Sequence, residues 1–189
     1  MEIVASLERT AALTGDVLAN VKPDQLDAPT PCTDWDVRAL LNHLVGGATM
    51  VAALGRDGRV DMSKMASDFV GDDPQGAWEA ASAAATSAWQ ADGALARTVT
   101  MPWGQELPAP AALTILRNDL FQHTWDLAKA TGQDTALDAD LAETVWAAVQ
   151  ENPGGVDAFR SMGLFGPVVE VAEAAPTADK VAGFFGRTP

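Results

Sequence analysis

Residues 110–132 read PAALTILRNDLFQHTWDLAKATG, and this stretch decides the fold. Projected at about 100° per residue, its leucines fall on one helical face: Leu113, Leu116, Leu120 and Leu127. Pro110 is tolerated in the first turn of a helix, and Gly132 is a typical stop. We therefore predict an amphipathic helix from Pro110 to Thr131 that packs its leucine face against other helices.

Two polar residues, Asp119 and His123, lie at the margin of that leucine face. Side chains four residues apart in a helix are neighbours, so this carboxylate and this imidazole can converge on one point. A carboxylate beside a core-facing stripe costs free energy unless its charge is compensated. No Lys or Arg shares the face within a turn, since Arg117 points elsewhere. A divalent cation is one economical partner for the pair, and an ordinary helix-surface ion pair is the alternative.

The other elements follow from the same periodicity. Helices are expected at residues 3–21, 34–54, 74–93 and 137–150, with a short closing helix at 177–185. Thr33 is the expected N-cap of the second helix, with Asp36 completing a variant capping box. Alternation near residues 98–108 indicates a short β-hairpin or extended segment, and residues 168–171 a further strand. The expected fold is all-α: a helix bundle in one domain, 1–189, with a small C-terminal appendage.

A third polar residue, His43, borders the apolar stripe of the second helix. Gly47, one turn later, leaves room beside this imidazole. His43 and His123 are the two histidines of the chain, and both are expected at core-facing margins of long helices. From spacing alone, they are either metal ligands or ordinary hydrogen-bonded histidines near a core.

Composition narrows the class of protein. The formal net charge of the 189 residues is −14 at pH 7, which argues against nucleic acid and anionic membranes as partners. No apolar run approaches the ~20 residues of a membrane span, and the N-terminus does not resemble a signal peptide. Cys32 is the one cysteine, which excludes an intramolecular disulfide and favours a reducing compartment. We expect a cytoplasmic protein with small-molecule partners, and a homodimer stays open.

Other residues near these segments receive structural interpretations. Cys32 is expected to be a small buried or cap-adjacent residue, and Trp35 and Trp125 to be core anchors. Asp126 could orient a ligand histidine. Because Asp126 is expected on a different helical face from His123, a solvated or loop-bonding role is preferred. Arg187, near the C-terminal end, is expected to form a salt bridge of the tail.

Two segments carry a family resemblance. Residues 30–47, TPCTDWDVRALLNHLVGG, resemble the second-helix signature of the DinB/YfiT-like metalloenzymes. Residues 119–132, with the core His123-Thr124-Trp125-Asp126-Leu127-Ala128, resemble the second signature. The ending from Phe165-Gly166-Pro167 to Pro189 is similar to the tail of small actinobacterial relatives. The most similar branch contains the N-terminal domain of mycothiol-dependent maleylpyruvate isomerases.

The resemblance implies a DinB-like four-helix bundle with long crossovers and a metal site. Its ligands map to His43, Asp119 and His123, where many relatives have Glu or His in place of Asp119. Three protein ligands with an open position make a catalytic type of site, suited to Zn²⁺, with Ni²⁺, Fe²⁺ or Mn²⁺ as alternatives. The expected function is a metal-dependent enzyme using a low-molecular-weight thiol, a mycothiol-type S-transferase or isomerase. A metal-dependent hydrolase and a non-catalytic metal- or small-ligand-binding protein are the alternatives.

Overall fold

The computed structural model describes residues 2–64, 67–161, 163 and 165–189. Its helices are α1 (Ile3–Ala19), α2 (Val37–Asp57), α3 (Pro74–Gln90), α4 (Ala109–Thr131), α5 (Ala139–Glu151), α6 (Pro153–Ser161) and α7 (Thr177–Phe184). Short 3-10 helices lie in the connections, at Pro23–Gln25, Met62–Lys64 and Ala94–Ala96. A two-stranded antiparallel hairpin joins β1 (Thr98–Thr100) to β2 (Glu106–Pro108). The prediction of an all-α fold with a short hairpin is confirmed.

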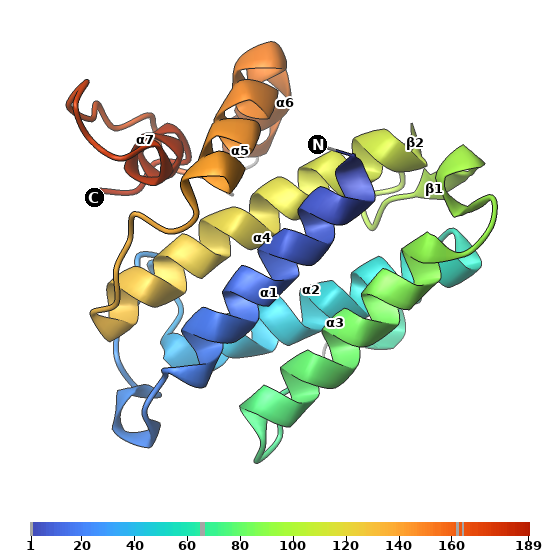
Figure 1. Ribbon diagram of the computed structural model, residues 1–189, viewed down its shortest axis with the longest axis horizontal. Helices are drawn as coiled ribbons and strands as arrows, with labels where there is room; N and C mark the ends of the chain where they lie inside the picture. The colour runs from blue at the N-terminus through green and yellow to red at the C-terminus, as the bar shows by residue number, and fades with distance from the viewer. Residues whose placement is uncertain (1, 65–66, 162, 164) are drawn as a thin grey trace.

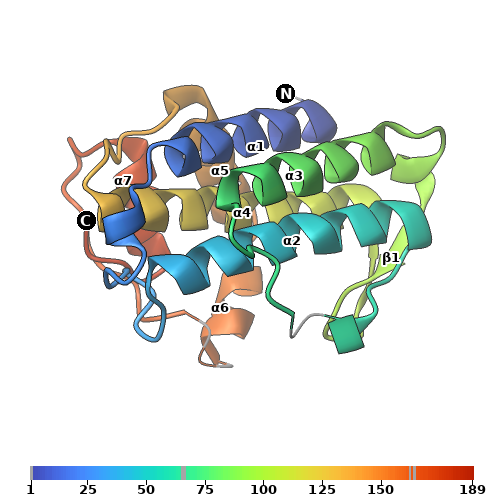
Figure 2. The same ribbon diagram turned by 90° about the horizontal axis from the view of Figure 1, so that it is seen from below.

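Helices α1 to α4 form the bundle. α1 packs against α3 and α4, and α2 packs against the same two helices (Figures 1 and 2). α2 and α3 run in the same direction, so the connection between them returns along the length of the bundle (Figure 1). This return is a long crossover of the kind that the family resemblance implies.

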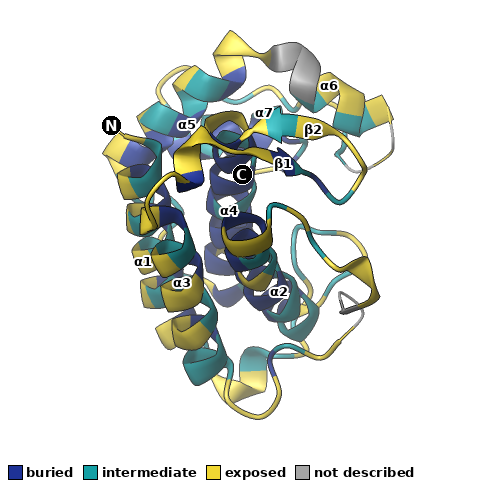
Figure 3. Ribbon diagram, turned by 90° about the vertical axis from the view of Figure 1, so that its right-hand side faces the viewer, coloured by how far each residue is buried: buried dark blue, intermediate teal, exposed yellow. Residues whose placement is uncertain are grey.

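Helix α4 is central, and it is buried on more than the one face that its leucines predict (Figure 3). Leu113 and Leu116 pack in one core cluster with residues of α2 and α3, and Leu127 packs in a second. Phe121 and Trp125, on the other side of α4, pack against α5 and α7 in a third cluster. α4 therefore separates the bundle from a C-terminal layer.

The helix ends differ in detail from the predictions. Asp36, rather than Thr33, is the N-cap of α2: its carboxylate accepts a hydrogen bond from the Ala39 N–H at 2.8 Å. α2 also continues to Asp57, about a turn beyond the expected end. α4 ends as predicted at Gly132, whose φ of +70° is readily adopted only by a residue without a Cβ atom.

The C-terminal layer contains two corrections. Residues 153–161 form α6, which no periodic pattern indicated, and residues 168–171 are not a strand. The Val169 N–H donates to the Gly183 carbonyl at 2.9 Å, so this segment bonds to α7 instead of a neighbouring strand. Gly183 permits this contact, because a Cβ atom there would collide with Val171.

Among the described helices, α2 alone is long and apolar enough to cross a membrane by length and composition. It nevertheless packs against α3 and α4, and Leu40, Leu41 and Leu54 are almost completely buried. These contacts are those of a helix in the core of a bundle, and such helices pass the same test of length and hydropathy.

Candidate metal centre

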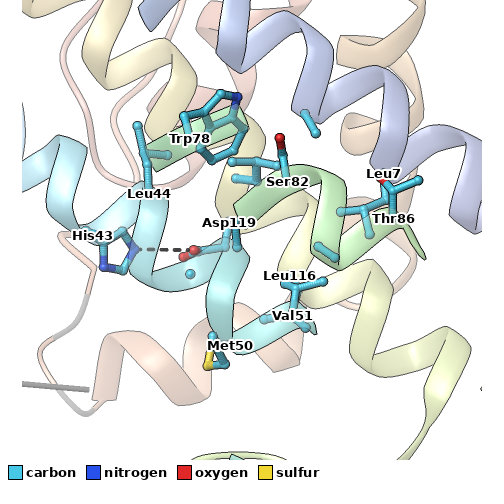
Figure 4. Close-up of a pocket in the computed structure, with 15 residues that line it drawn as sticks. Leu7, His43, Leu44, Met50, Val51, Trp78, Ser82, Thr86, Leu116 and Asp119 are labelled. Atoms are coloured by element: carbon cyan, nitrogen blue, oxygen red, sulfur yellow. Dashed lines mark ion pairs between the residues drawn. The ribbon is translucent and has the colours of Figure 1, made fainter. Parts of the chain in front are cut away.

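The structure brings together the three residues that the sequence singled out. His43 comes from α2, and Asp119 and His123 come from successive turns of α4. Asp119 Oδ2 lies 3.5 Å from His43 Nε2, and Asp119 Oδ1 lies 3.5 Å from His123 Nε2. One potential ligand atom of each residue lies within 4.8 Å of the other two. Figure 4 shows His43 and Asp119 pointing toward each other, with a dashed line marking their ion pair.

The three side chains differ in their access to solvent. The His123 side chain is 7% exposed, whereas those of His43 and Asp119 are 36% and 40% exposed. The group is therefore anchored on the buried side by His123 and open on the other. A small molecule could approach it without displacing a helix.

A divalent cation fits this donor set. The His43 Nε2 atom is buried and makes no hydrogen bond to any residue that the structure describes, although it faces the Asp119 carboxylate. A buried ring nitrogen without a hydrogen-bond partner costs free energy, and a bound cation would supply the missing partner. Two imidazole nitrogens and a carboxylate that converge with an open side form a set typical of catalytic metal sites.

The charges in the group are strongly coupled. Partial removal from water raises the pKa of Asp119, but the imidazoles of His123 and His43 outweigh it and hold that pKa well below its usual range. Burial lowers the pKa of His123, but Asp119 and Asp126 outweigh it and raise that pKa well above its usual value. A carboxylate and an imidazolium thus face each other, and a bound cation would take the place of the imidazolium proton.

Asp126 lies directly behind His123, which corrects the expectation of a solvated role. Its carboxylate is completely buried, and its Oδ2 lies 3.0 Å from His123 Nδ1. Residues three apart are about 60° apart around a helix, so Asp126 and His123 are neighbours. When the Nδ1–H group of His123 donates a hydrogen bond to Asp126, the Nε2 atom of His123 is left facing Asp119. Metal-ligating histidines commonly have such a carboxylate partner.

Arg187 completes this buried network from the far end of the chain. Its Nε donates to Asp126 Oδ1 at 3.0 Å, and its Nη2 donates to Asp126 Oδ2 at 3.1 Å. Burial raises the pKa of Asp126, but the hydrogen bonds from His123 and Arg187 outweigh this and lower it. The expected tail salt bridge exists, but it is buried and supports the site.

Cys32 and Trp35 also lie at the site, on the loop before α2. Cys32 Sγ is 3.2 Å from both Asp126 Oδ2 and Arg187 Nη2, and 3.7 Å from His123 Nδ1. The Trp35 ring is half-buried, and its centroid lies 4.7 Å from that of His43 and 5.6 Å from that of His123. Trp35 packs against the edge of a core cluster, as expected, and it also forms a wall of the site.

A second group of potential ligands consists of Cys32, His123 and Asp126. Both oxygens of Asp126 already accept hydrogen bonds from Arg187, so a cation there would compete with a buried guanidinium. Neither His43 nor Asp119 pairs with a Lys or Arg of α2 or α4. The group of His43, Asp119 and His123 is therefore the better candidate.

Comparisons with known proteins agree with this architecture. The family model of the mycothiol maleylpyruvate isomerase N-terminal domain matches residues 7–128. Two uncharacterised proteins of Mycobacterium tuberculosis, MT0763 and Rv0738, are each 35% identical over 189 residues, covering 100% of this chain and 99% of theirs.

The fold is also similar to solved structures. The crystal structure of the mycothiol-dependent maleylpyruvate isomerase matches with a TM-score of 0.61 and 14% identity, over 78% of this chain and 68% of that one. A histidine-to-alanine mutant of that isomerase matches over the same shares, with a TM-score of 0.60. With the family model spanning most of the bundle, the chain belongs to the family of the mycothiol maleylpyruvate isomerase N-terminal domain.

Proposed function

We propose that this protein binds one divalent metal ion through His43, Asp119 and His123. We further propose that it uses the metal to activate a low-molecular-weight thiol of the mycothiol type, for isomerisation of a small substrate or transfer of the thiol to it. The convergence of two imidazoles and one carboxylate around the unbonded His43 Nε2 atom carries the metal proposal. The family, whose name includes mycothiol, supports the thiol.

Each residue has a distinct role in the proposed site. His43 and His123 supply neutral nitrogen ligands, and Asp119 supplies a negative charge that offsets part of the charge of the cation. Asp126 holds the His123 ring by its Nδ1 atom. A bound Zn²⁺, Ni²⁺, Fe²⁺ or Mn²⁺ ion, with Zn²⁺ as the first choice, would stabilise the thiolate form of the thiol near neutral pH.

The open side of the group favours an enzyme over a protein that only stores metal. The exposed parts of His43 and Asp119 leave a position that a thiol can reach from solvent. Trp35 covers the adjoining side of both imidazoles and excludes water from that part. A reduced thiol and a small organic substrate are cytoplasmic molecules, so we place the protein in the cytoplasm.

Metal analysis of the purified protein tests the proposal. We expect about one equivalent of metal in the wild type and a loss of most of it in both His43→Ala and His123→Ala. Asp134→Ala, an acid-to-alanine change outside the group of three ligands, serves as the control and should keep its metal. No metal in the wild type after loading with each of the four ions would overturn the proposal.

The thiol is tested separately on the metal-loaded protein. Replacement of the metal by Co²⁺ should give a sulfur-to-cobalt charge-transfer absorption when mycothiol is added, and His123→Ala should not show it. Stoichiometric metal without any thiol-dependent absorption would leave a non-catalytic metal-binding protein or a hydrolase and would exclude the thiol enzyme.

A further inference from the structure

A narrow hollow runs from the candidate metal centre into the bundle, between α1, α2, α3 and α4. His43 and Asp119 line it together with Leu44, Trp78 and Leu116 (Figure 4). Its atom-free volume is ≈ 510 Å³ with the open mouth included, but the centre of a water-sized sphere fits into only ≈ 30 Å³ of it. One water needs about 10–15 Å³ on that measure, so the hollow suits a slender group.

The walls of the hollow are almost entirely apolar. Apart from His43 and Asp119, the polar residues that line it are Ser82 and Thr86 of α3, and no Lys or Arg is among the described residues that line it. A carboxylate placed inside would lose its hydration without gaining a cation from the walls. The hollow therefore selects an uncharged group.

The buried arginines offer no counter-charge either. Arg117 donates its hydrogen bonds to Ser6 Oγ and Asn118 Oδ1, on the side of α4 away from the hollow. Arg187 is held by both oxygens of Asp126. A negatively charged substrate would have to displace one of these bonds to obtain a guanidinium partner.

Gly47 keeps the hollow open. The neighbouring glycines of α2 have packing reasons: a Cβ atom would lie 3.0 Å from the Phe69 ring at Gly46 and 2.9 Å from Ala88 Cβ at Gly55. At Gly47 a Cβ atom would meet nothing within 4 Å, although glycine within a helix lowers its stability relative to alanine. Gly47 lines the hollow, so its missing side chain leaves space there rather than closing a helix contact.

We propose that this hollow binds an uncharged, unbranched hydrocarbon group, and that the substrate of this protein carries such a group next to its reacting atom. The inference rests on the proposed function for the reaction itself. Binding in the hollow depends on the walls alone, so it can be measured without metal.

Titration of metal-free protein with straight-chain 1-alkanols, from propanol to octanol, tests this proposal. Amide signals of α2 and α3, followed by NMR, should shift on binding. Each added methylene should strengthen binding about four-fold until the hollow is filled, since about 0.8 kcal/mol accompanies each buried methylene. Alkanoates of equal length should bind at least ten-fold more weakly. Equal affinity for alkanols and alkanoates would overturn the proposal.

A matched pair of variants locates the binding. Gly47→Leu should place its side chain in the hollow and abolish alkanol binding, and its melting temperature should show that it is folded. Thr49→Leu adds the same side chain to an exposed position of α2 and should bind as the wild type does. Unchanged binding by a folded Gly47→Leu variant would show that the hollow is not the site. A wild type that binds alkanols but no metal would overturn the proposed function alone.

Discussion

A single buried carboxylate, Asp126, connects two ends of the chain at the candidate site. It contacts His123 on its own helix and Arg187 close to the C-terminus. The helical spacing of His123 and Asp126 is visible in the sequence, because residues three apart in a helix are neighbours. The partnership with Arg187 has no local signal, because 61 residues separate the two positions.

Replacement of Asp126 by asparagine tests its role behind His123. Asp126→Asn keeps the shape of the side chain but removes the charge that holds both His123 and Arg187. We expect the metal affinity to fall about 10- to 100-fold, the usual range for such supporting residues. Competition with a chromophoric chelator measures this, at a temperature well below the melting point of the variant.

The exposed acid Asp140 provides the control for this change. Asp140→Asn removes the same charge far from the ligands and should leave the metal affinity within two-fold of the wild type. If Asp126→Asn bound metal as tightly as Asp140→Asn, the carboxylate would not position His123.

At the scale of the element, the start of α2 lies about one turn later than the sequence predicts, at Asp36 instead of Thr33. Thr33 and Asp36 are both good N-cap residues, and the apolar stripe begins directly after them. Residues 30–35 instead form a turn, in which Thr30 Oγ1 donates to the Trp35 carbonyl at 2.9 Å. This turn places Trp35 against the histidines, and the helix begins only after it.

The two capping interpretations predict different stabilities. Asp36→Ala should lower the free energy of unfolding by about 1 kcal/mol, because the Ala39 N–H loses its acceptor. Thr33→Ala should change it by less than about 0.5 kcal/mol, as expected for an exposed residue without such a contact. Urea unfolding measures both values. A larger loss for Thr33→Ala than for Asp36→Ala would indicate Thr33 as the N-cap of α2.

Helix α4 is buried on more than one face, which a helical projection of its leucines does not predict. The leucine face was predicted, but Phe121 and Trp125 also lie in a core, between α4 and the C-terminal layer. A helix that is buried on several sides has a weak amphipathic pattern. Its polar residues are then the informative ones, because each buried polar group needs a partner.

For the whole molecule, the attachment of the C-terminal layer to the bundle matters most. Arg9 of α1 donates through Nε and Nη2 to the two oxygens of Asp138, each at 2.8 Å, and Asp138 is also the N-cap of α5. Phe121 and Trp125 of α4 pack against α5 and α7 beneath this contact. The layer in turn holds Arg187 in place beside Asp126.

The Arg9–Asp138 pair should make stability depend on pH. Burial raises the pKa of Asp138. The hydrogen bonds from the Leu141 N–H and from Arg9 have a larger effect, so the pKa of Asp138 is lower than its usual value. A carboxyl whose pKa is lower in the folded state stabilises the fold above its unfolded pKa of ~3.9, and this contribution is lost as the pH falls through the folded value. Asp138→Asn retains a good N-cap residue but removes the ion pair.

Melting temperatures of the wild type and D138N between pH 7 and pH 2 measure this contribution. We expect the variant to melt lower at pH 7, by about 2 °C or less because the pair is partly exposed. The difference should shrink toward zero below pH 4. A difference that stays constant down to pH 2 would contradict the proposed electrostatic origin.

Several predictions concern the protein as a whole and stay predictions. They are the single domain over residues 1–189 and the cytoplasmic location, and a homodimer stays open. The identity of the metal belongs with them, because nitrogen and carboxylate donors suit several divalent ions.

The sequence by itself determined the described helices other than α6, the hairpin and the pairing of Asp119 with His123, because these depend on contacts within a few residues of the chain. Its family resemblance added His43 to the pair. Only the tertiary structure decided that Trp35 covers both histidines, that Arg187 secures Asp126, and that an apolar hollow begins at the ligands. Such contacts join residues far apart in the chain, and periodicity shows which face of a helix is buried but not what it meets there.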